Sequence, residues 1–182
     1  MPSYPFLILK WVVGKSLRKA QYMILSNNKS TLVGLVLLIV FFIQYVFGFQ
    51  WDWLFQLQKE EMYKRWSGLA LALLITFQWL LTVFRITKRW RPYAMRMQTI
   101  HKWLGALSPI IFYIHSISLG YGYLLLLSYI FLSNALLGYL NLDVIKNNSD
   151  LLFKSWMITH VALSIIITIL MFFHITMVFY YK

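Results

Sequence analysis

The sequence predicts an all-α membrane protein, a polytopic helical bundle with five transmembrane helices. The 182 residues are 60% hydrophobic and only 12% charged, whereas soluble domains carry about 25% charged residues. Five apolar stretches are each long enough to cross the hydrocarbon core of a bilayer. The net charge of +12 is concentrated between these stretches, where positive-inside charge and anionic lipid explain it better than nucleic-acid binding does.

The N-terminal residues 1–31 are expected to form a basic amphipathic segment on the cytoplasmic leaflet. They mix apolar residues with lysine and arginine and offer no cleavage site after a clean apolar run, so we do not expect a signal peptide. A partly ordered basic tail is the alternative. Residues 32–182 are expected to form a single transmembrane domain.

The first expected span is 32–49, which contains no charge. Gly34 and Gly48 lie fourteen residues apart in it, which suits ordinary close helix packing, the interpretation we favour, or space for a bound cofactor. Residues 50–65 are expected to be a loop whose aromatic residues anchor it at the membrane interface. The second span is expected at 66–84.

The strongest signal for orientation is 85–98, which carries five basic residues and no acidic residue. Such a loop is expected in the cytoplasm. The basic N-terminal segment lies two crossings away and therefore faces the same side, and the C-terminus lies outside. The expected location is a cytoplasmic membrane, such as the inner membrane of a bacterium.

The third span is expected at 100–119, where Pro109 should kink the helix or free a carbonyl group. The short turn at 120–122 makes the third and fourth spans antiparallel neighbours. The remaining segments are the fourth span at 123–140, a neutral cytoplasmic loop at 141–154 and the fifth span at 155–181.

The four histidines of the chain form two pairs, one in the third span and one in the fifth. His101 and His115 are fourteen residues apart, and so are His160 and His174. Fourteen steps of about 100° place both members of a pair on one helix face, about 21 Å apart along the axis. Because both spans run outward, His101 should share an inner level with His160, and His115 an outer level with His174.

Histidine pairs at two depths of a bilayer predict two b haems and electron transfer. An ionisable residue there is costly, and neutral imidazole is a good axial ligand of haem iron. The absence of cysteine excludes iron–sulfur ligation and covalent haem attachment, and no Gly-rich loop indicates flavin or nicotinamide binding. The alternatives are a zinc site, which needs three or four clustered ligands, a proton relay, which usually uses carboxylates, and packed structural histidines.

Cations and hydroxyl groups near the two levels are candidate partners of the haems. Arg91, Arg96 and Lys102 surround the inner level and can pair with haem propionates, although positive-inside charge explains them equally well. Tyr121 and Tyr123 are candidates for hydrogen bonds at the outer level.

The spacing of the histidines resembles that of di-haem b-type membrane cytochromes, most of all the ferric-reductase-like transmembrane domain shared with NADPH oxidases. That family carries its pairs on its third and fifth helices, and the resemblance covers about 66–181. The chain is also similar to the cytochrome b of quinol-oxidising complexes. The resemblance implies a four-helix haem-binding core made of spans two to five.

Two departures from these families bear on function. The sequence stops after the fifth expected span, without the sixth helix and the flavin and nicotinamide domain of the reductases. The second span has only Gly68 where the quinol family has paired glycines, and no quinone-pocket motif is present.

We therefore expect an electron-transfer subunit of a larger redox complex, or a chain served by a separate reductase, rather than an enzyme on its own. One alternative is a non-redox membrane anchor or assembly subunit. Another is a haem-bearing anchor that exchanges electrons with quinol. The expected partners are other redox subunits or a reductase, the lipid bilayer and, in the last case, a quinone, but not nucleic acid.

Overall fold

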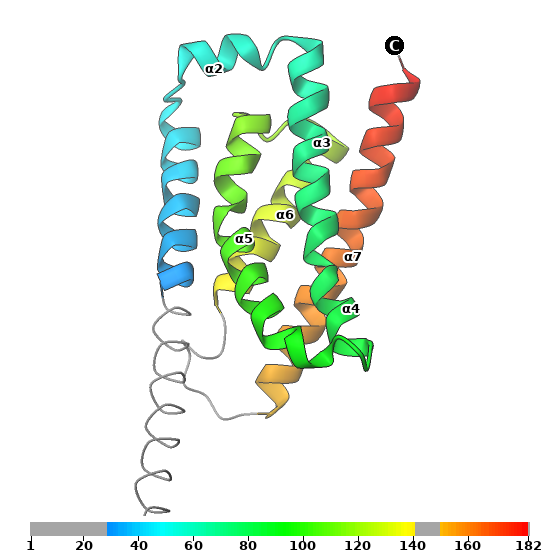
Figure 1. Ribbon diagram of the computed structural model, residues 1–182. Helices are drawn as coiled ribbons and strands as arrows, with labels where there is room; N and C mark the ends of the chain where they lie inside the picture. Colours follow the sequence, from blue (N-terminus) through cyan, green and yellow to red (C-terminus); the bar gives the residue numbers. More distant parts are fainter. Residues whose placement is uncertain (1–28, 141–149, 182) are drawn as a thin grey trace, which may run out of the picture.

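A computed structural model describes residues 29–140 and 150–181, and the regular structure in these ranges is entirely helical. Most of the N-terminal segment expected at 1–31 and most of the loop expected at 141–154 lie outside these residues. Figure 1 shows that the long helices alternate in direction along one axis. In chain order they are Lys29–Phe47, α3 (Glu61–Gln78), α5 (Ala94–His115), α6 (Tyr123–Tyr139) and α7 (Asp150–Tyr180).

Three of these helices are long and apolar enough to cross a membrane. They are Lys29–Phe47, Glu61–Ile86 and Asp150–Tyr180. The second consists of α3 and α4 (Leu80–Ile86), which are separated by a break at Trp79. At most 22% of the most apolar window of each helix is buried inside the molecule, so most of the apolar side chains face outward. Apolar surface of this extent is suited to lipid rather than water.

The segment expected to be a loop at 50–65 is largely helical, so that prediction was wrong. Helix α2 (Asp52–Leu57) lies across one end of the bundle (Figure 1), and α3 begins at Glu61. The preceding helix ends where Gly48 adopts a φ of 66°, a left-handed conformation that favours glycine. The charged residues of this segment mark the limit of the apolar stretch, but a helix can continue beyond that limit.

Helices α5 and α7 also begin earlier than the sequence predicted. The span expected at 100–119 corresponds to α5, which begins at Ala94 and already ends at His115. The span expected at 155–181 corresponds to α7, which begins at Asp150. In both cases polar or charged residues precede the apolar stretch, and they form the first turns of the helix.

The turn between α5 and α6 makes these helices antiparallel neighbours, as expected. Gly120 and Gly122 both have positive φ, 76° and 58°, which glycine adopts at little cost. The Ser128 hydroxyl donates to the Leu119 carbonyl at 2.9 Å and ties this turn to α6. The turn therefore fixes where the C-terminal end of α5 lies relative to α6.

Pro109 lies inside α5 and is fully buried. Proline has no N–H group to donate to the carbonyl four residues earlier, which belongs to Gly105. That carbonyl instead accepts hydrogen bonds from the hydroxyls of Ser108 and Tyr139, each at 2.8 Å. The prediction that Pro109 frees a carbonyl is confirmed, and the freed group ties α5 to α6.

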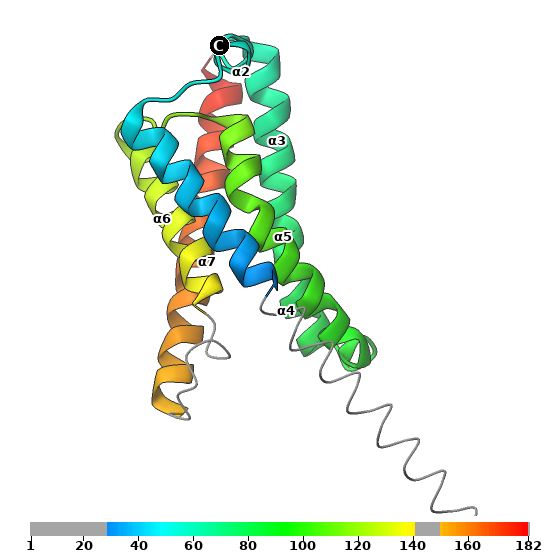
Figure 2. The same cartoon turned by 90° about the vertical axis from the view of Figure 1, so that its left-hand side faces the viewer.

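Aromatic rings from three helices form the centre of the core. The ring centres of Phe41 and Phe112 are 5.5 Å apart, and Phe112 stacks on Phe131 at 5.5 Å. Figure 2 shows the helix Lys29–Phe47 crossing α5 and α6. A Cβ at Gly34 would lie 2.6 Å from the Tyr139 ring, so Gly34 allows close helix packing, the interpretation favoured from the sequence.

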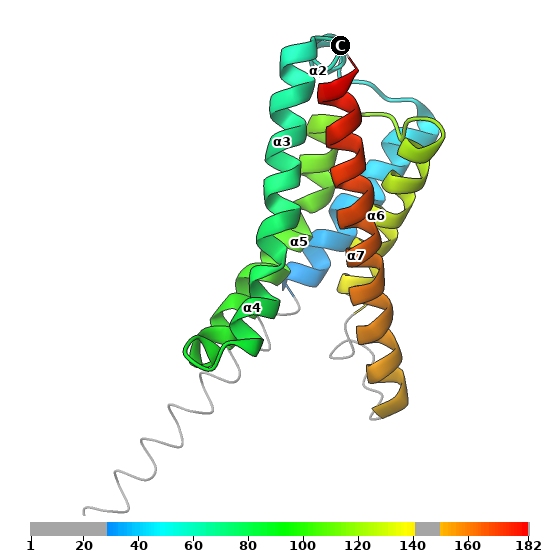
Figure 3. The same ribbon diagram turned by 90° about the vertical axis from the view of Figure 1, so that its right-hand side faces the viewer.

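Hydrogen bonds between side chains and neighbouring helices join α7 to the bundle. In a bilayer, helices associate through close packing and such bonds, because lipid is as apolar as the helices themselves. Trp79 Nε1 donates to Thr168 Oγ1 at 3.0 Å, and Trp156 Nε1 donates to the Leu137 carbonyl at 2.8 Å. Helix α7 therefore contacts both α3 and α6, between which it lies in Figure 3.

Candidate functional site

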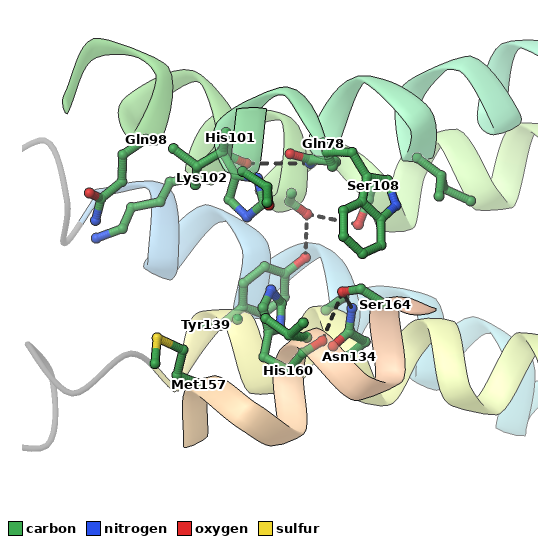
Figure 4. Close-up of a pocket in the computed structure, with 18 of the residues that line it drawn as sticks. Gln78, Gln98, His101, Lys102, Ser108, Asn134, Tyr139, Met157, His160 and Ser164 are labelled. Atoms are coloured by element: carbon green, nitrogen blue, oxygen red, sulfur yellow. Dashed lines mark hydrogen bonds between the residues drawn. The ribbon is translucent and has the colours of Figure 1, made fainter. Parts of the chain in front are cut away.

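His101 of α5 and His160 of α7 face each other across a cavity of about 330 Å³. Their ring centres are 6.3 Å apart, and the ring planes are inclined by 81°. Figure 4 shows the two imidazoles on opposite sides of this cavity. The structure thus brings together the two histidines that the sequence placed at the inner level, and we call this cavity the inner site.

Unpartnered polar atoms are concentrated at the inner site. The Nδ1 atoms of His101 and His160, Gln78 Oε1 and Asn134 Oδ1 are buried without a hydrogen-bond partner, and all four residues line the cavity. They make up four of the five such side-chain atoms among the described residues. Buried polar groups are usually paired, and an unpaired one costs about 1–3 kcal/mol. Their concentration here makes this cavity the candidate binding site among the described residues.

The distance between the two imidazoles suits a single metal ion held between them. A metal–nitrogen bond is about 2 Å long. When the distance from each nitrogen to the centre of its ring is added on both sides, two such rings have centres about 6 Å apart, close to the observed 6.3 Å. Within the described ranges, no three histidine, aspartate or glutamate side chains gather as a closed zinc site requires. Two opposed imidazoles are the axial ligand set of a b haem, so the residues present fit this group better than zinc.

The backbone around both inner histidines is fixed by polar side chains. Gln78 Nε2 lies 3.4 Å from the His101 carbonyl. Asn134 Nδ2 donates to Ser164 Oγ at 3.0 Å, and that hydroxyl donates to the His160 carbonyl at 2.8 Å. Neither Asn134 nor Ser164 was predicted from the sequence to have a role, although an asparagine within an apolar span is itself a signal of a polar contact.

The His160 ring is also confined by its neighbours. Trp156 lies parallel to it, with the planes inclined by 4° and the ring centres 5.9 Å apart. A Cβ at Gly138 would lie 3.4 Å from His160 Cε1. One turn of α7 and the absence of a side chain on α6 therefore determine the orientation of this imidazole.

The cations at the inner site are only partly those expected. Lys102 lines the cavity together with Gln98, and Figure 4 shows them at the same end of it. Arg85 is a further lining residue, and its Nη2 lies 3.4 Å from Gln98 Oε1. Arg91 and Arg96 are exposed and do not belong to the lining. From the sequence, Arg85 was only one of the basic residues that indicate the orientation of the chain in the membrane. The sequence does not show that the end of α4 brings Arg85 to the cavity.

The second pair, His115 and His174, lies towards the other end of α5 and α7, and we call it the outer site. The two imidazoles are near enough to interact electrostatically. Ser67 Oγ is 3.1 Å from His115 Nδ1, and the Tyr123 hydroxyl is 3.4 Å from His174 Nδ1. Tyr123 was one of the two expected partners at this level. The other, Tyr121, is 91% exposed.

The end of α5 that carries His115 is held by residues of the α2–α3 corner. Gln58 is buried, and its Nε2 lies 2.7 Å from the Tyr113 carbonyl and 3.0 Å from the Ile114 carbonyl. Its Oε1 accepts from the Ile117 N–H at 3.0 Å, and the Tyr63 hydroxyl donates to the Ile114 carbonyl at 3.0 Å. The sequence analysis missed Gln58, because it lies in the presumed loop.

No family model, no curated protein and no solved structure matches this chain. The class of protein is therefore defined by the structure itself. It is an all-α bundle that contains three helices able to cross a membrane, and it carries two histidine pairs on the parallel helices α5 and α7.

Proposed function

We propose that the chain is a five-span membrane protein that transfers electrons across the bilayer through two b haems. The observation that carries this proposal is the pairing of His101 with His160, whose ring centres lie 6.3 Å apart across a cavity. The helices that bring them together bring a second pair, His115 and His174, to their other end. Two histidine pairs at two depths suit two haems that are stacked along the membrane normal.

The five-span topology rests on the packing of α5 and α6 among the three long apolar helices. Helix α6 has 17 residues and would be about 26 Å long at about 1.5 Å per residue. That length is close to the hydrocarbon thickness of about 30 Å. Since α5 contacts α3, α4 and α6, and α6 contacts α7, both helices would lie at the same depth as their neighbours.

Each histidine pair would hold one haem, His101 and His160 at the inner site, and His115 and His174 at the outer site. Bound haem iron would supply one-electron redox chemistry. Iron held by two imidazoles would be closed to dioxygen and peroxide, so the residues favour electron transfer. Lys102 and Arg85 would offer cations to the propionates at the inner site.

The electrons would come from another protein or from quinol. Residues 1–182 contain no cysteine and no Gly-rich phosphate-binding loop, so they offer no iron–sulfur ligands and no recognisable nicotinamide or flavin site. We propose that the chain works as a subunit of a larger redox complex or with a separate reductase.

The test is a reduced-minus-oxidised absorption spectrum of the purified protein with a measured ratio of haem to chain. We expect a b-type signal and two haems per chain. His115→Ala should remove one haem and His101→Ala the other. Ile114→Ala is the matched control, because this neighbour of His115 is 42% exposed and should keep both haems. A colourless protein whose histidines tolerate substitution would contradict the proposal and favour the anchor function.

A further inference from the structure

The other contacts of Ser67 favour one direction for its hydrogen bond with His115. Ser67 Oγ lies 2.8 Å from the Tyr63 carbonyl and 3.3 Å from the Lys64 carbonyl. A carbonyl oxygen only accepts, so the single hydroxyl proton is donated towards the α3 backbone. The same Oγ lies 3.1 Å from His115 Nδ1. A hydroxyl that donates to the Tyr63 carbonyl accepts at His115, and in that arrangement the imidazole donates from Nδ1.

A proton on Nδ1 determines what the other ring nitrogen can do. A neutral imidazole carries one proton, so an Nδ1–H group leaves a lone pair on Nε2. Histidines that bind metals typically donate their second nitrogen to an oxygen acceptor, which fixes the tautomer and the ring orientation. Gly68 adds a steric limit, because a Cβ there would lie 2.9 Å from His115 Cε1. Two consecutive residues of α3 therefore constrain this ring.

We propose that Ser67 is a positioning residue that holds His115 as the Nδ1–H tautomer and so presents the Nε2 lone pair to a metal ion. The nature of that ion, a haem iron, rests on the proposed function, whereas the tautomer is a property of the polypeptide. Among the described residues the other histidines differ. The Nδ1 atoms of His101 and His160 contact no hydroxyl group, and the Tyr123 hydroxyl makes no second hydrogen bond that would set the direction of its contact with His174.

The first measurement is a potentiometric titration of the haem-loaded protein. A hydrogen bond from Nδ1–H makes the imidazole a stronger donor to ferric iron. Ser67→Ala should therefore raise the midpoint potential of one haem, the one that His115→Ala removes, and leave the other unchanged. Ser67→Thr keeps the hydroxyl and should restore the wild-type potential. Thr76→Ala is the matched control, because the Thr76 hydroxyl also bonds to an α3 carbonyl, that of Ala72 at 2.9 Å.

The second measurement reads the tautomer in haem-free protein labelled with ¹⁵N-histidine and held in lipid nanodiscs. The His115 signals are those missing from His115→Asn. The nitrogen chemical shifts should show a protonated Nδ1 in the wild type and in Thr76→Ala, and an Nε2-protonated population in Ser67→Ala. A wild-type His115 protonated on Nε2, or two haems of unchanged potential in Ser67→Ala, would overturn the inference. Failure to bind haem would instead refute the proposed function. The tautomer measured in the haem-free protein would then decide whether Ser67 positions His115.

Discussion

Two glycines at the histidines show how single residues shape the candidate sites. A Cβ at Gly68 would lie 2.9 Å from His115 Cε1, and a Cβ at Gly138 would lie 3.4 Å from His160 Cε1. The missing side chains let each imidazole lie directly against a neighbouring helix. Space for a cofactor was the alternative interpretation of the fourteen residues between Gly34 and Gly48, but Gly34 packs on Tyr139 and a Cβ at Gly48 would meet no atom within 4 Å.

Substitution of these two glycines should affect the two proposed haems separately. Gly68→Ala should displace the His115 ring, because 2.9 Å is shorter than carbon atoms tolerate, and should reduce occupancy of the outer haem. Gly138→Ala should have a smaller effect, on the inner haem, because a contact of 3.4 Å can be relieved by a small shift. Haem content and difference spectra measure both effects, and each variant controls for the other. Unchanged spectra and stoichiometry in Gly68→Ala would contradict the assignment of His115.

At the scale of one element, the C-terminal end of α5 depends on side chains from outside the helix. The last four carbonyls of a helix have no partner within it. Gln58 and Tyr63 bond to the carbonyls of Tyr113 and Ile114, immediately before His115. Because His115 is the last residue of α5, fraying of this end would move a proposed ligand. The α2–α3 corner therefore stabilises the helix and positions its histidine.

Gln58→Ala should destabilise the protein more than a surface substitution does. It removes three hydrogen bonds and leaves the N–H of buried Ile117 and the carbonyl of half-buried Tyr113 without this partner, at a cost of about 2 kcal/mol or more in the free energy of unfolding. Gln56→Ala is the matched control, because Gln56 is exposed on α2. Thermal unfolding followed by circular dichroism in detergent measures the difference. Equal melting temperatures for the two variants would show that Gln58 does not hold α5.

At the scale of the whole molecule, the two ends of the bundle differ in charge and in the residues they carry. The inner site lies near the basic segment between α4 and α5, and α2 and the C-terminus lie at the opposite end (Figure 1). Basic segments favour the cytoplasmic side of a membrane. We therefore expect the end with α2 to face outward.

Single cysteines can test this orientation without background, because the chain contains none. Tyr121 is 91% exposed in the turn before α6, and Lys88 is exposed in the basic segment at the other end. Tyr121→Cys should react with a membrane-impermeant thiol reagent added to intact cells, and Lys88→Cys only after the membrane is opened. The reverse pattern of labelling would contradict the proposed topology.

Helix limits and contacts between distant residues were the least predictable features. Residues 50–65 were assigned to a loop because their charges contrast with the apolar spans, yet they include α2 and the start of α3. Gln58 bonds to residues 55 to 59 positions further along the chain. Such pairings depend on how helices are rotated and packed, which the pattern of one segment does not report.

The sequence by itself determined the all-α class, the approximate positions of the apolar helices and the placing of each histidine pair on one helix face, because these follow from composition and from the helical period of about 3.6 residues. It also predicted the carbonyl freed by Pro109, since proline lacks an N–H group. Only the tertiary structure decided which groups meet. It places Arg85 and Lys102 at the inner site rather than Arg91 and Arg96, and it sets Ser67 against His115, because helix rotation and packing determine such contacts.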